Sequence, residues 1–382
     1  MLRGGTPDRA PFFPDISTWY QAQRLGVGAE QPFWPGQYIP DDAPIHDMIA
    51  GGRWARGRPT YVELYREHGW GLPAHVYDWF DESLVRGAER LVDTRGRERS
   101  VTFRLPKGEL RREYRLDAEG TWSELGHMAP RLEDLDLVRS LVERTERRSQ
   151  PERVDRFLHE TEGFGVCDLV IFRSPFGKLV HEYMGFENLV YALDDDEGAI
   201  LDFMAFQEEH DLELIDMAAA MPGPIVIISD HADENLISPP WYRSYCMPFY
   251  AKACERLHRA GKLVSTHLDG NFHGLLDFIG ETGFDLLDGC TPAPMFNYEV
   301  EELAAAMQPS RTGGRVMSAY CGVPSGLFTF GYPRSGIEDF GERIVRAFGG
   351  RVIVNVGDIL PPTGDIEAVI ALGERVESLP LD

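Results

Sequence analysis

Residues 262–271 read KLVSTHLDGN, an apolar run that ends in histidine, aspartate, glycine and asparagine. Such a run is typical of a buried parallel strand, because both faces of that strand are covered by other parts of the protein. The polar residues after it indicate a strand end at the rim of a sheet, where side chains can be presented to a ligand. His267 and Asp269 are two residues apart, so we expect both side chains to point to the same side of the strand.

The same arrangement recurs along the second half of the chain. Short, mostly apolar runs alternate with longer amphipathic stretches that have helical spacing. Six such units predict a parallel α/β fold, in which strands and helices alternate. The five other runs are CDLVIFR (167–173), PIVIISD (224–230), FDLLDGC (284–290), RVMSAYCG (315–322) and RVIVNVGD (351–358).

Two further strands, expected near residues 10–15 and 73–79, would bring the total to eight and close a (β/α)8 TIM barrel. An open doubly wound sheet is the alternative, but no G-x-G-x-x-G pattern follows the first strand. Residues 87–125 differ from the rest, because their alternating charges and glycine turns predict β-hairpins that could form a lid or a dimer contact. We therefore expect a single domain over residues 1–382, a TIM barrel with an N-terminal extension and a β-hairpin insertion.

The composition limits the partners and the location. The net charge of −24 disfavours nucleic acid and anionic membranes as partners, because phosphate binding requires basic patches. A small-molecule substrate remains open even if it is anionic, since it needs only a few arginines. The five cysteines are scattered and form no CxxC pair, which favours the reducing cytoplasm over a disulfide framework. We find no secretory signal and no apolar stretch of about 18 residues that would span a membrane. A homodimer is compatible with the sequence.

The ends of the predicted strands supply the candidate catalytic residues, because TIM barrels place their active sites there. We select His267, Asp269 and Asp230. An imidazole beside a carboxylate could bind a divalent metal, or Asp269 could orient His267 as an acid–base pair. Alternatively, Asp269 caps the turn at Gly270. Asp230 belongs to the stretch SDHADEN (229–235), whose ionisable groups could bind a ligand or cap the next helix.

Other candidates would line the same mouth of the barrel. Asp358 follows the last strand and would face the same side as the histidine above. Arg24 and Arg173 could hold a substrate carboxylate, although arginines on the surface are common. Trp19 could wall an apolar pocket. Cys321 lies at a strand end, where it could contact the substrate or simply be a small buried side chain.

Six longer stretches occur in the following order: TPDRAPFFP, GELRREYRLDAEGTW, SPFGKLVHEYMGFENLVYALDDDEGAI, ISPPWYRSYCMPFYAKACERLHRAGKLVSTHLDG, TGFDLLDGCTPAP and VNVGDILPPTGDIEAV. As an ordered set they resemble the uroporphyrinogen decarboxylase superfamily, which also contains cobalamin-dependent methyltransferases. The resemblance spans nearly the whole chain. It implies a TIM barrel whose active cleft lies at the C-terminal ends of the strands.

The resemblance also implies a metal site. The zinc methyltransferases of this superfamily carry His-x-Cys at the end of one strand and a second cysteine near the last strand. The matching positions here are His267 with Asp269, and Asp358, so carboxylates replace both thiolates. Oxygen ligands would make the metal a harder Lewis acid. We therefore expect these three residues to bind a divalent metal such as Zn²⁺.

The resemblance separates two activities. The decarboxylases hold the carboxylates of their substrate with an arginine-rich N-terminal stretch, but the matching stretch STWYQAQRLG keeps only Trp19 and Arg24 and lacks the arginine cluster. We therefore expect a methyltransferase that moves a methyl group between a small methylated compound and a corrinoid carried by a partner protein. The alternatives are a decarboxylase (a lyase) acting on a carboxylated, tetrapyrrole-like substrate, and a non-catalytic binding protein on the same barrel.

Overall fold

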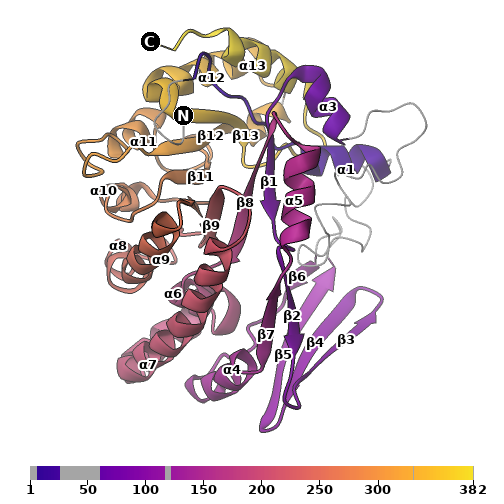
Figure 1. The fold of residues 1–382 in the computed structure, drawn as a ribbon, viewed down its shortest axis with the longest axis vertical. Helices are drawn as coiled ribbons and strands as arrows, with labels where there is room; N and C mark the ends of the chain where they lie inside the picture. The colour runs from indigo at the N-terminus through magenta and orange to yellow at the C-terminus, as the bar shows by residue number, and fades with distance from the viewer. Residues whose placement is uncertain (1–6, 26–60, 117–121, 330, 382) are drawn as a thin grey trace.

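The computed structural model describes residues 7–25, 61–116, 122–329 and 331–381 (Figure 1). Its main feature is a curved, seven-stranded sheet in which neighbouring strands are parallel and helices cover the outer face. The predicted parallel α/β fold is therefore confirmed. In order across the sheet, the strands are β1 (Leu72–Val76), β8 (Gly165–Phe172), β9 (Ile225–Ser229), β10 (Leu263–His267), β11 (Leu286–Cys290), β12 (Ser318–Pro324) and β13 (Val352–Gly357).

A short N-terminal segment, rather than an eighth strand, lies against the two edges of this sheet. Val354 in the edge strand β13 donates its N–H to the carbonyl of Pro11 at 2.9 Å, and Gly71 beside β1 donates to the carbonyl of Phe12 at 3.0 Å. The segment forms an isolated bridge at Phe12 and no regular strand, so the expectation of eight strands exceeds what the described residues contain. Pro11 and Pro14 lack an N–H and cannot extend a ladder of hydrogen bonds. The sheet is TIM-barrel-like.

The helices lie outside the sheet, and α7 (Phe186–Ala219) is the longest of those described. At Asp196 its backbone leaves helical geometry (φ −156°, ψ 79°), and the Asp196 carboxylate accepts the N–H of Ala199 at 3.0 Å. A second helical segment therefore begins there with its own N-cap. Within the described ranges, no helix is both long enough and apolar enough to cross a membrane. The other α-helices are α1 (Ser17–Leu25), α3 (Tyr61–His68), α4 (Leu135–Val142), α5 (Pro151–Glu160), α6 (Pro175–Lys178), α8 (Pro239–Trp241), α9 (Met247–Arg259), α10 (Leu276–Ile279), α11 (Val300–Ala306), α12 (Arg334–Phe348) and α13 (Ile366–Ser378).

The two faces of the parallel sheet bury different side chains. Outward-facing residues such as Val264 and Leu287 pack against the helices in the main hydrophobic core. Leu286, Tyr320 and Ile353 face inward and form a separate, small apolar cluster. Side chains alternate along a strand, so the next inward positions come two residues later, closer to the carboxyl ends. Several of these positions hold polar residues, and they form the layer in which the candidate site lies.

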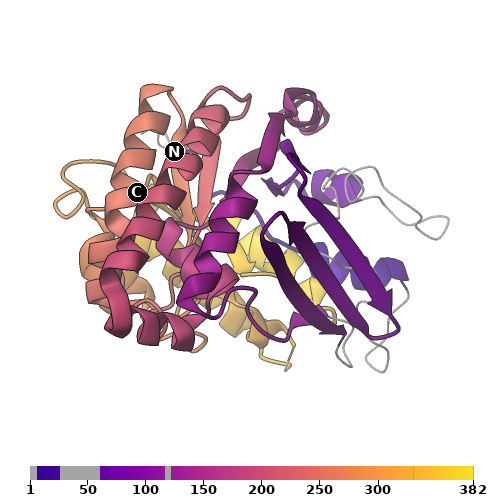
Figure 2. The same cartoon turned by 90° about the horizontal axis from the view of Figure 1, so that it is seen from below.

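The stretch 87–125 contains an antiparallel sheet of four strands, in the order β3 (Glu89–Arg95), β4 (Glu98–Leu105), β5 (Gly108–Leu116) and β6 (Trp122–Glu124). It is preceded by β2 (Phe80–Leu84), which pairs with β7 (Thr145–Ser149) in a small sheet of its own. Figures 1 and 2 show that the four-stranded sheet stands to one side of the parallel sheet. We call it the insertion sheet.

Candidate functional site

His267 is the last residue of β10, and its side chain points into the interior enclosed by the curved sheet. It lies opposite Asp288 of β11 in the sheet register, and the Asp288 carboxylate accepts a hydrogen bond from Nδ1 of His267 at 2.7 Å. Nε2 is then left to face the mouth of the sheet, 3.9 Å from Oδ1 of Asp358. Gly289 makes room for the ring, because a Cβ there would lie 2.6 Å from Cε1 of His267. Asp288 therefore determines which nitrogen of His267 is available to a ligand.

Three potential ligand atoms from two neighbouring strand ends meet at this mouth. His231, His267 and Asp269 each offer one atom, and these atoms all lie within 4.8 Å of one another. Nδ1 of His231 is 3.9 Å from Oδ2 of Asp269. Ligands about 2.0–2.1 Å from a zinc ion stand about 3.4 Å apart in a tetrahedron, so small side-chain rotations would bring these atoms to ligand positions. Nitrogen and oxygen donors suit zinc and several other divalent ions. We call these three residues the candidate ligand cluster.

Hydrogen bonds between the loops after β9 and β10 hold the cluster in place. The N–H of His231 donates to the carbonyl of His267 at 3.2 Å, and the N–H of Glu234 donates to the carbonyl of Asn271 at 2.7 Å. The Asp233 carboxylate accepts the N–H of Asn271 at 2.9 Å. His231 itself has a positive φ of 48°, a conformation that non-glycine residues seldom adopt and that often occurs at functional sites. The acidic residues of this loop therefore position the two loops relative to each other.

The electrostatic environment prepares most of these groups for binding a cation. Burial lowers the pKa of His231, so its ring is neutral. Interaction with His231 lowers the pKa of Asp269, so its carboxylate is ionised. Burial opposes protonation of His267, but its hydrogen bond to Asp288 and the surrounding carboxylates outweigh burial and raise its pKa. Burial also raises the pKa of Asp358 to about 6, so this carboxylate can take up and release a proton near neutral pH.

A further charged group, His75, approaches Asp288 from across the interior. Nδ1 of His75 on β1 donates to Asp168 on β8 at 2.9 Å, and Nε2 of His75 lies 3.9 Å from Oδ2 of Asp288. Burial opposes protonation of His75, but Asp168 and its neighbouring carboxylates raise its pKa to about 10, so the ring is a cation at neutral pH. Since β1 and β11 are not neighbours in the sheet, this contact crosses the interior. Asp288 therefore links His75 to His267.

Asp230, which we selected from the sequence, does not face the cluster. It is completely buried, and its carboxylate accepts hydrogen bonds from the N–H of Ser174 at 3.1 Å and from the hydroxyl of Tyr250. The reason is alternation along the strand. Ile228 packs outward into the main core, so Asp230 points outward as well and the residue after it, His231, points inward. Asp230 therefore ties β9 to the segment after β8. His231, and not Asp230, occupies the position in the site that was predicted for Asp230.

The predicted substrate contacts are not gathered in one place. Cys321 is buried in the main core on the outer face of β12, because its neighbour Tyr320 faces inward, so the structure does not bring this thiol to the cluster. Trp19 packs, partly buried, against the same core. Arg24 lies in α1, and its side chain is outside the described part of the structure. None of these three residues is placed at the cluster by the described contacts.

Arg173 is the predicted substrate residue that lies near the mouth. It follows β8 with a positive φ of 54°, and its guanidinium donates to Glu182 at 3.1 Å. The guanidinium carbon lies 6.0 Å from the centre of the Phe172 ring. Arg173 is also close enough to His231 to lower the pKa of that ring, although burial is the larger cause. An anionic part of a substrate would meet positive charge at this point.

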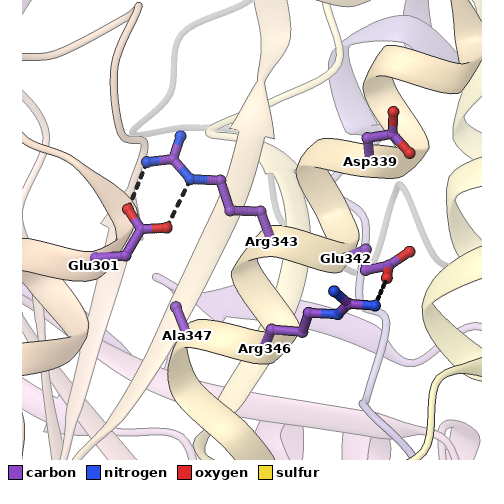
Figure 3. Close-up of a pocket in the computed structure, with 6 residues that line it drawn as sticks. All are labelled: Glu301, Asp339, Glu342, Arg343, Arg346 and Ala347. Carbon is purple, nitrogen blue, oxygen red and sulfur yellow. Dashed lines mark hydrogen bonds and ion pairs between the residues drawn. The ribbon is translucent and has the colours of Figure 1, made fainter.

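A hollow of about 500 Å³ lies elsewhere, on the outer helices (Figure 3). Four of its charged side chains form two pairs: Arg343 donates to Glu301 at 2.8 Å, and Arg346 pairs with Glu342. Such exposed pairs contribute little to stability. The hollow is lined by none of the candidate ligands, so we place the functional site at the strand ends instead.

The sequence predicts His267, Asp269 and Asp358 as site residues. Two residues that lie beside them in the structure, Asp288 and His231, were not selected from the sequence. The signal for Asp288 is its position inside the apolar run FDLLDGC, because a buried carboxylate requires a partner. His231 lies two residues after a residue of β9 that faces inward, so alternation along the strand indicates that His231 faces inward as well. Both signals depend on knowing which face of the strand points inward.

The fold and the site together define a TIM-barrel-like α/β protein with ionisable residues gathered at the carboxyl ends of its strands. Residues 173–379 match the family model described as "Uroporphyrinogen decarboxylase (URO-D)", which is more than half of the chain. The chain therefore belongs to the uroporphyrinogen decarboxylase family, as its sequence motifs predict. No curated protein matches it at a significant level.

Solved structures with the same fold include a methyltransferase from Methanosarcina mazei. It matches with a TM-score of 0.60 and 14% sequence identity, over 98% of this chain and 95% of that chain. A B12-independent methionine synthase from Shewanella sp. W3-18-1 matches with a TM-score of 0.45 and 10% identity, over 96% of each chain. At such low identity, the first likeness shows the fold alone.

Proposed function

We propose that this protein is a metal-dependent methyltransferase that moves a methyl group between a small methylated compound and a corrinoid carried by a partner protein. The observation that carries this proposal is the meeting of His231, His267 and Asp269 at the carboxyl ends of the strands, where TIM-barrel enzymes have their active sites. Membership of the uroporphyrinogen decarboxylase family supports an enzyme, and the shared fold with a protein named as a methyltransferase suggests the reaction class.

Each residue would have a distinct role. A divalent ion such as Zn²⁺ would be held by Nε2 of His267, a ring nitrogen of His231 and the carboxylate of Asp269. His231 is then the third ligand, in place of Asp358, which was predicted from the sequence. When bound, the ion would polarise the heteroatom that carries the methyl group and make it a better leaving group. Asp288 holds the ring of His267 in the binding orientation. Asp358, with its pKa of about 6, donates a proton to the heteroatom as the methyl group leaves.

The proposal treats the sheet as a complete (β/α)8 barrel that residues 11–13 close. The hydrogen bonds from this segment to both edges support closure. So does the 3.9 Å approach of His75 on β1 to Asp288 on β11, since an open, flat sheet would keep these side chains far apart. A closed barrel gathers the strand ends into one mouth, as a single catalytic centre requires.

Metal content is the first test. The wild-type protein and Asp269→Ala would be purified without chelators or a metal-binding tag, and their bound metals measured by elemental mass spectrometry. We expect close to one equivalent of a divalent ion in the wild type and its loss in Asp269→Ala. Asp277→Ala, which removes an exposed carboxylate on α10, should keep the ion and serves as the control. No metal in the wild-type protein would exclude the mechanism as stated.

Methyl transfer is the second test. Free reduced cobalamin would replace the unidentified corrinoid protein, and its absorption spectrum would report methylation in the presence of small O-, N- and S-methyl compounds. We expect the metal-loaded wild type to methylate cobalamin with at least one of these classes, and Asp269→Ala to lose this activity. Activity that persists at full rate after metal removal would contradict the proposed role of the ion.

A carboxy-lyase reaction is the second candidate function. Asp358 could protonate the carbon that loses carbon dioxide, because its pKa is about 6, and Arg173 could bind a carboxylate at the mouth. Proton transfer from Asp358 and charge pairing with Arg173 need no metal. Turnover of a carboxylated substrate by the metal-free protein, lost in Asp358→Asn, would favour this reaction over methyl transfer.

A further inference from the structure

Two aromatic side chains line the mouth beside the candidate ligand cluster. Val76 on β1 packs outward in the main core, so the next residue, Tyr77, faces the interior as His75 does. Ile171 on β8 also packs outward, so Phe172 at the end of that strand faces the interior. Strands β1 and β8 are neighbours in the sheet. Tyr77 and Phe172 therefore form one part of the wall at the carboxyl ends of the strands.

The two rings form an apolar surface that remains open to solvent. Their centroids are 5.7 Å apart and their planes differ by 21°, so the rings are stacked. Tyr77 and Phe172 are each 40% exposed, although side chains that face the interior of a small barrel usually fill it. Binding pockets are lined mainly by aromatic and apolar side chains, with a few polar groups that fix the orientation of the ligand. This pair therefore offers a contact surface for a flat ring.

Arg173 adds a positive charge beside this surface. Its guanidinium carbon lies 6.0 Å from the centre of the Phe172 ring. Glu182 accepts a hydrogen bond from one end of the guanidinium, but Nε is buried and has no partner among the described residues. The remaining donors of a guanidinium fit a carboxylate, which can accept two parallel hydrogen bonds. Arg173 can therefore hold a carboxylate while the aromatic pair contacts the ring that carries it.

The charges around the mouth give such a ligand a direction. Burial, and to a smaller degree the charges of His267 and Arg173, lower the pKa of His231, so Arg173 lies close to the candidate ligand cluster. The carboxylates of Asp269 and Asp358 follow β10 and β13, which lie beyond β9 when counted from β8. These carboxylates repel an anionic group, whereas Arg173 attracts it. A ligand whose carboxylate binds Arg173 therefore turns its other end towards the cluster.

We propose that the methyl compound is an aryl methyl ether that carries a carboxylate, an inference that rests on the proposed methyl transfer. Tyr77 and Phe172 contact its ring, Arg173 binds its carboxylate, and its ether oxygen lies at the candidate ligand cluster. Leaving-group chemistry favours the ether. A phenol has a pKa of about 10, as tyrosine does, whereas a simple alcohol is about as weak an acid as water, whose pKa is about 16. A phenolate therefore leaves more readily than an alkoxide.

The transfer balances with reduced cobalamin as the acceptor. The bond between the ether oxygen and the methyl carbon breaks, and its electron pair stays on the oxygen, which takes up a proton to give the phenol. The methyl carbon forms a bond with Co(I) of the cobalamin, which supplies both electrons and becomes Co(III). The products are a hydroxybenzoate and methylcobalamin, and no further oxidant or reductant is consumed.

Isothermal titration calorimetry on the purified wild type tests the ligand class. The probe is 4-methoxybenzoate, compared with 4-methoxybenzamide, which lacks the charge, and with 4-methoxycyclohexanecarboxylate, which lacks the aromatic ring. We expect a dissociation constant below about 1 mM for the probe. The amide should bind at least about tenfold more weakly and the saturated carboxylate at least about threefold more weakly. Equal binding of either analogue, or no binding of the probe, would overturn the proposal.

Variants assign each preference to its residues. In Arg173→Gln, the probe and the amide should bind equally, because no cation distinguishes them. In the double variant Tyr77→Leu/Phe172→Leu, the aromatic and saturated carboxylates should bind equally, while the preference for carboxylate over amide remains. A misfolded variant would lose both preferences at once. Tyr191→Leu removes an aromatic side chain that is 63% exposed on α7, and should bind all three compounds as the wild type does. Preferences that persist in the first two variants would contradict these contacts.

Methyl transfer from the probe to reduced cobalamin separates this proposal from the proposed function. We expect 4-hydroxybenzoate and methylcobalamin to form in equal amounts, measured by chromatography and by absorption. Transfer from aliphatic methyl compounds alone would overturn the aryl ether and leave the proposed function standing, whereas no transfer from any methyl compound would count against the proposed function. If Tyr77→Leu/Phe172→Leu raised the KM for cobalamin but not for the probe, the two rings would contact the corrin instead, and the proposal would be wrong.

Discussion

The role of Asp288 can be tested directly, because its proposed function in metal binding is to hold His267 in the binding orientation. Replacing Asp288 with Asn keeps the size of a side chain that is only 5% exposed, so no large cavity is created. The change removes the negative charge that holds the Nδ1 proton of His267 across 2.7 Å. Residues that orient a metal-binding histidine in this way typically change metal affinity by 10–100-fold when they are substituted.

We therefore expect Asp288→Asn to bind zinc about 10–100-fold more weakly than the wild type, which is about 1.4–2.7 kcal/mol in binding free energy. The dissociation constants would be measured by competition with a chromophoric chelator. The absorption spectrum of bound Co²⁺ would give a second readout, because it reports the arrangement of the ligands. His267→Ala should remove binding altogether.

Asp168→Asn is the matched control. It removes another inward-facing carboxylate, but Asp168 hydrogen-bonds to His75 and not to His267. We expect it to change zinc affinity less than threefold, since the orientation of the ligand ring is untouched. If Asp288→Asn binds zinc within twofold of the wild type while folded, or if the control shows an equal loss, then Asp288 does not position the ring.

Three further predictions concern Gly289, His75 and Lys178. Gly289→Ala should weaken zinc binding at least tenfold in the same competition assay, because its Cβ would lie 2.6 Å from the ligand ring. Gly313→Ala, at another positive φ but with nothing within 4 Å of the new Cβ, should not. The folded-state pKa of His75, about 10, lies above its ordinary 6.5, so its stabilising contribution is complete below pH 6.5 and is lost as the pH rises towards 10. Thermal unfolding should therefore show that the free energy of unfolding of the wild type exceeds that of His75→Gln by less and less across this pH range. The difference starts at no more than about 5 kcal/mol. It is smaller in practice, because the side chain is 27% exposed. Lys178→Met should destabilise the fold by about 3–5 kcal/mol in urea unfolding, because it leaves the completely buried Asp211 carboxylate without its cation, and a second change of Asp211→Leu should recover most of this loss.

The parallel sheet could be predicted because its signal is local: each strand carries its own apolar run and its own polar end. Which of Asp230 and His231 faces the interior could not be predicted. The two are consecutive residues, and a shift of one residue moves a side chain to the other face of the sheet. The contact between His75 and Asp288 is harder still. The two residues are far apart in the chain and on strands that are not neighbours, so only the curvature of the sheet brings them together.

The hydrogen bonds between the loops after β9 and β10 have a consequence for how an ion would enter and leave. Ordering a free loop costs about 1–2 kcal/mol for each residue that is fixed. In this protein, Asp233 and the backbone bonds to Asn271 order both loops when the chain folds, whether or not an ion is bound. An arriving ion would meet its ligands already assembled, so its binding free energy would not be reduced by loop closure. Loading would then take place at a rigid rim, without rearrangement of the surrounding fold.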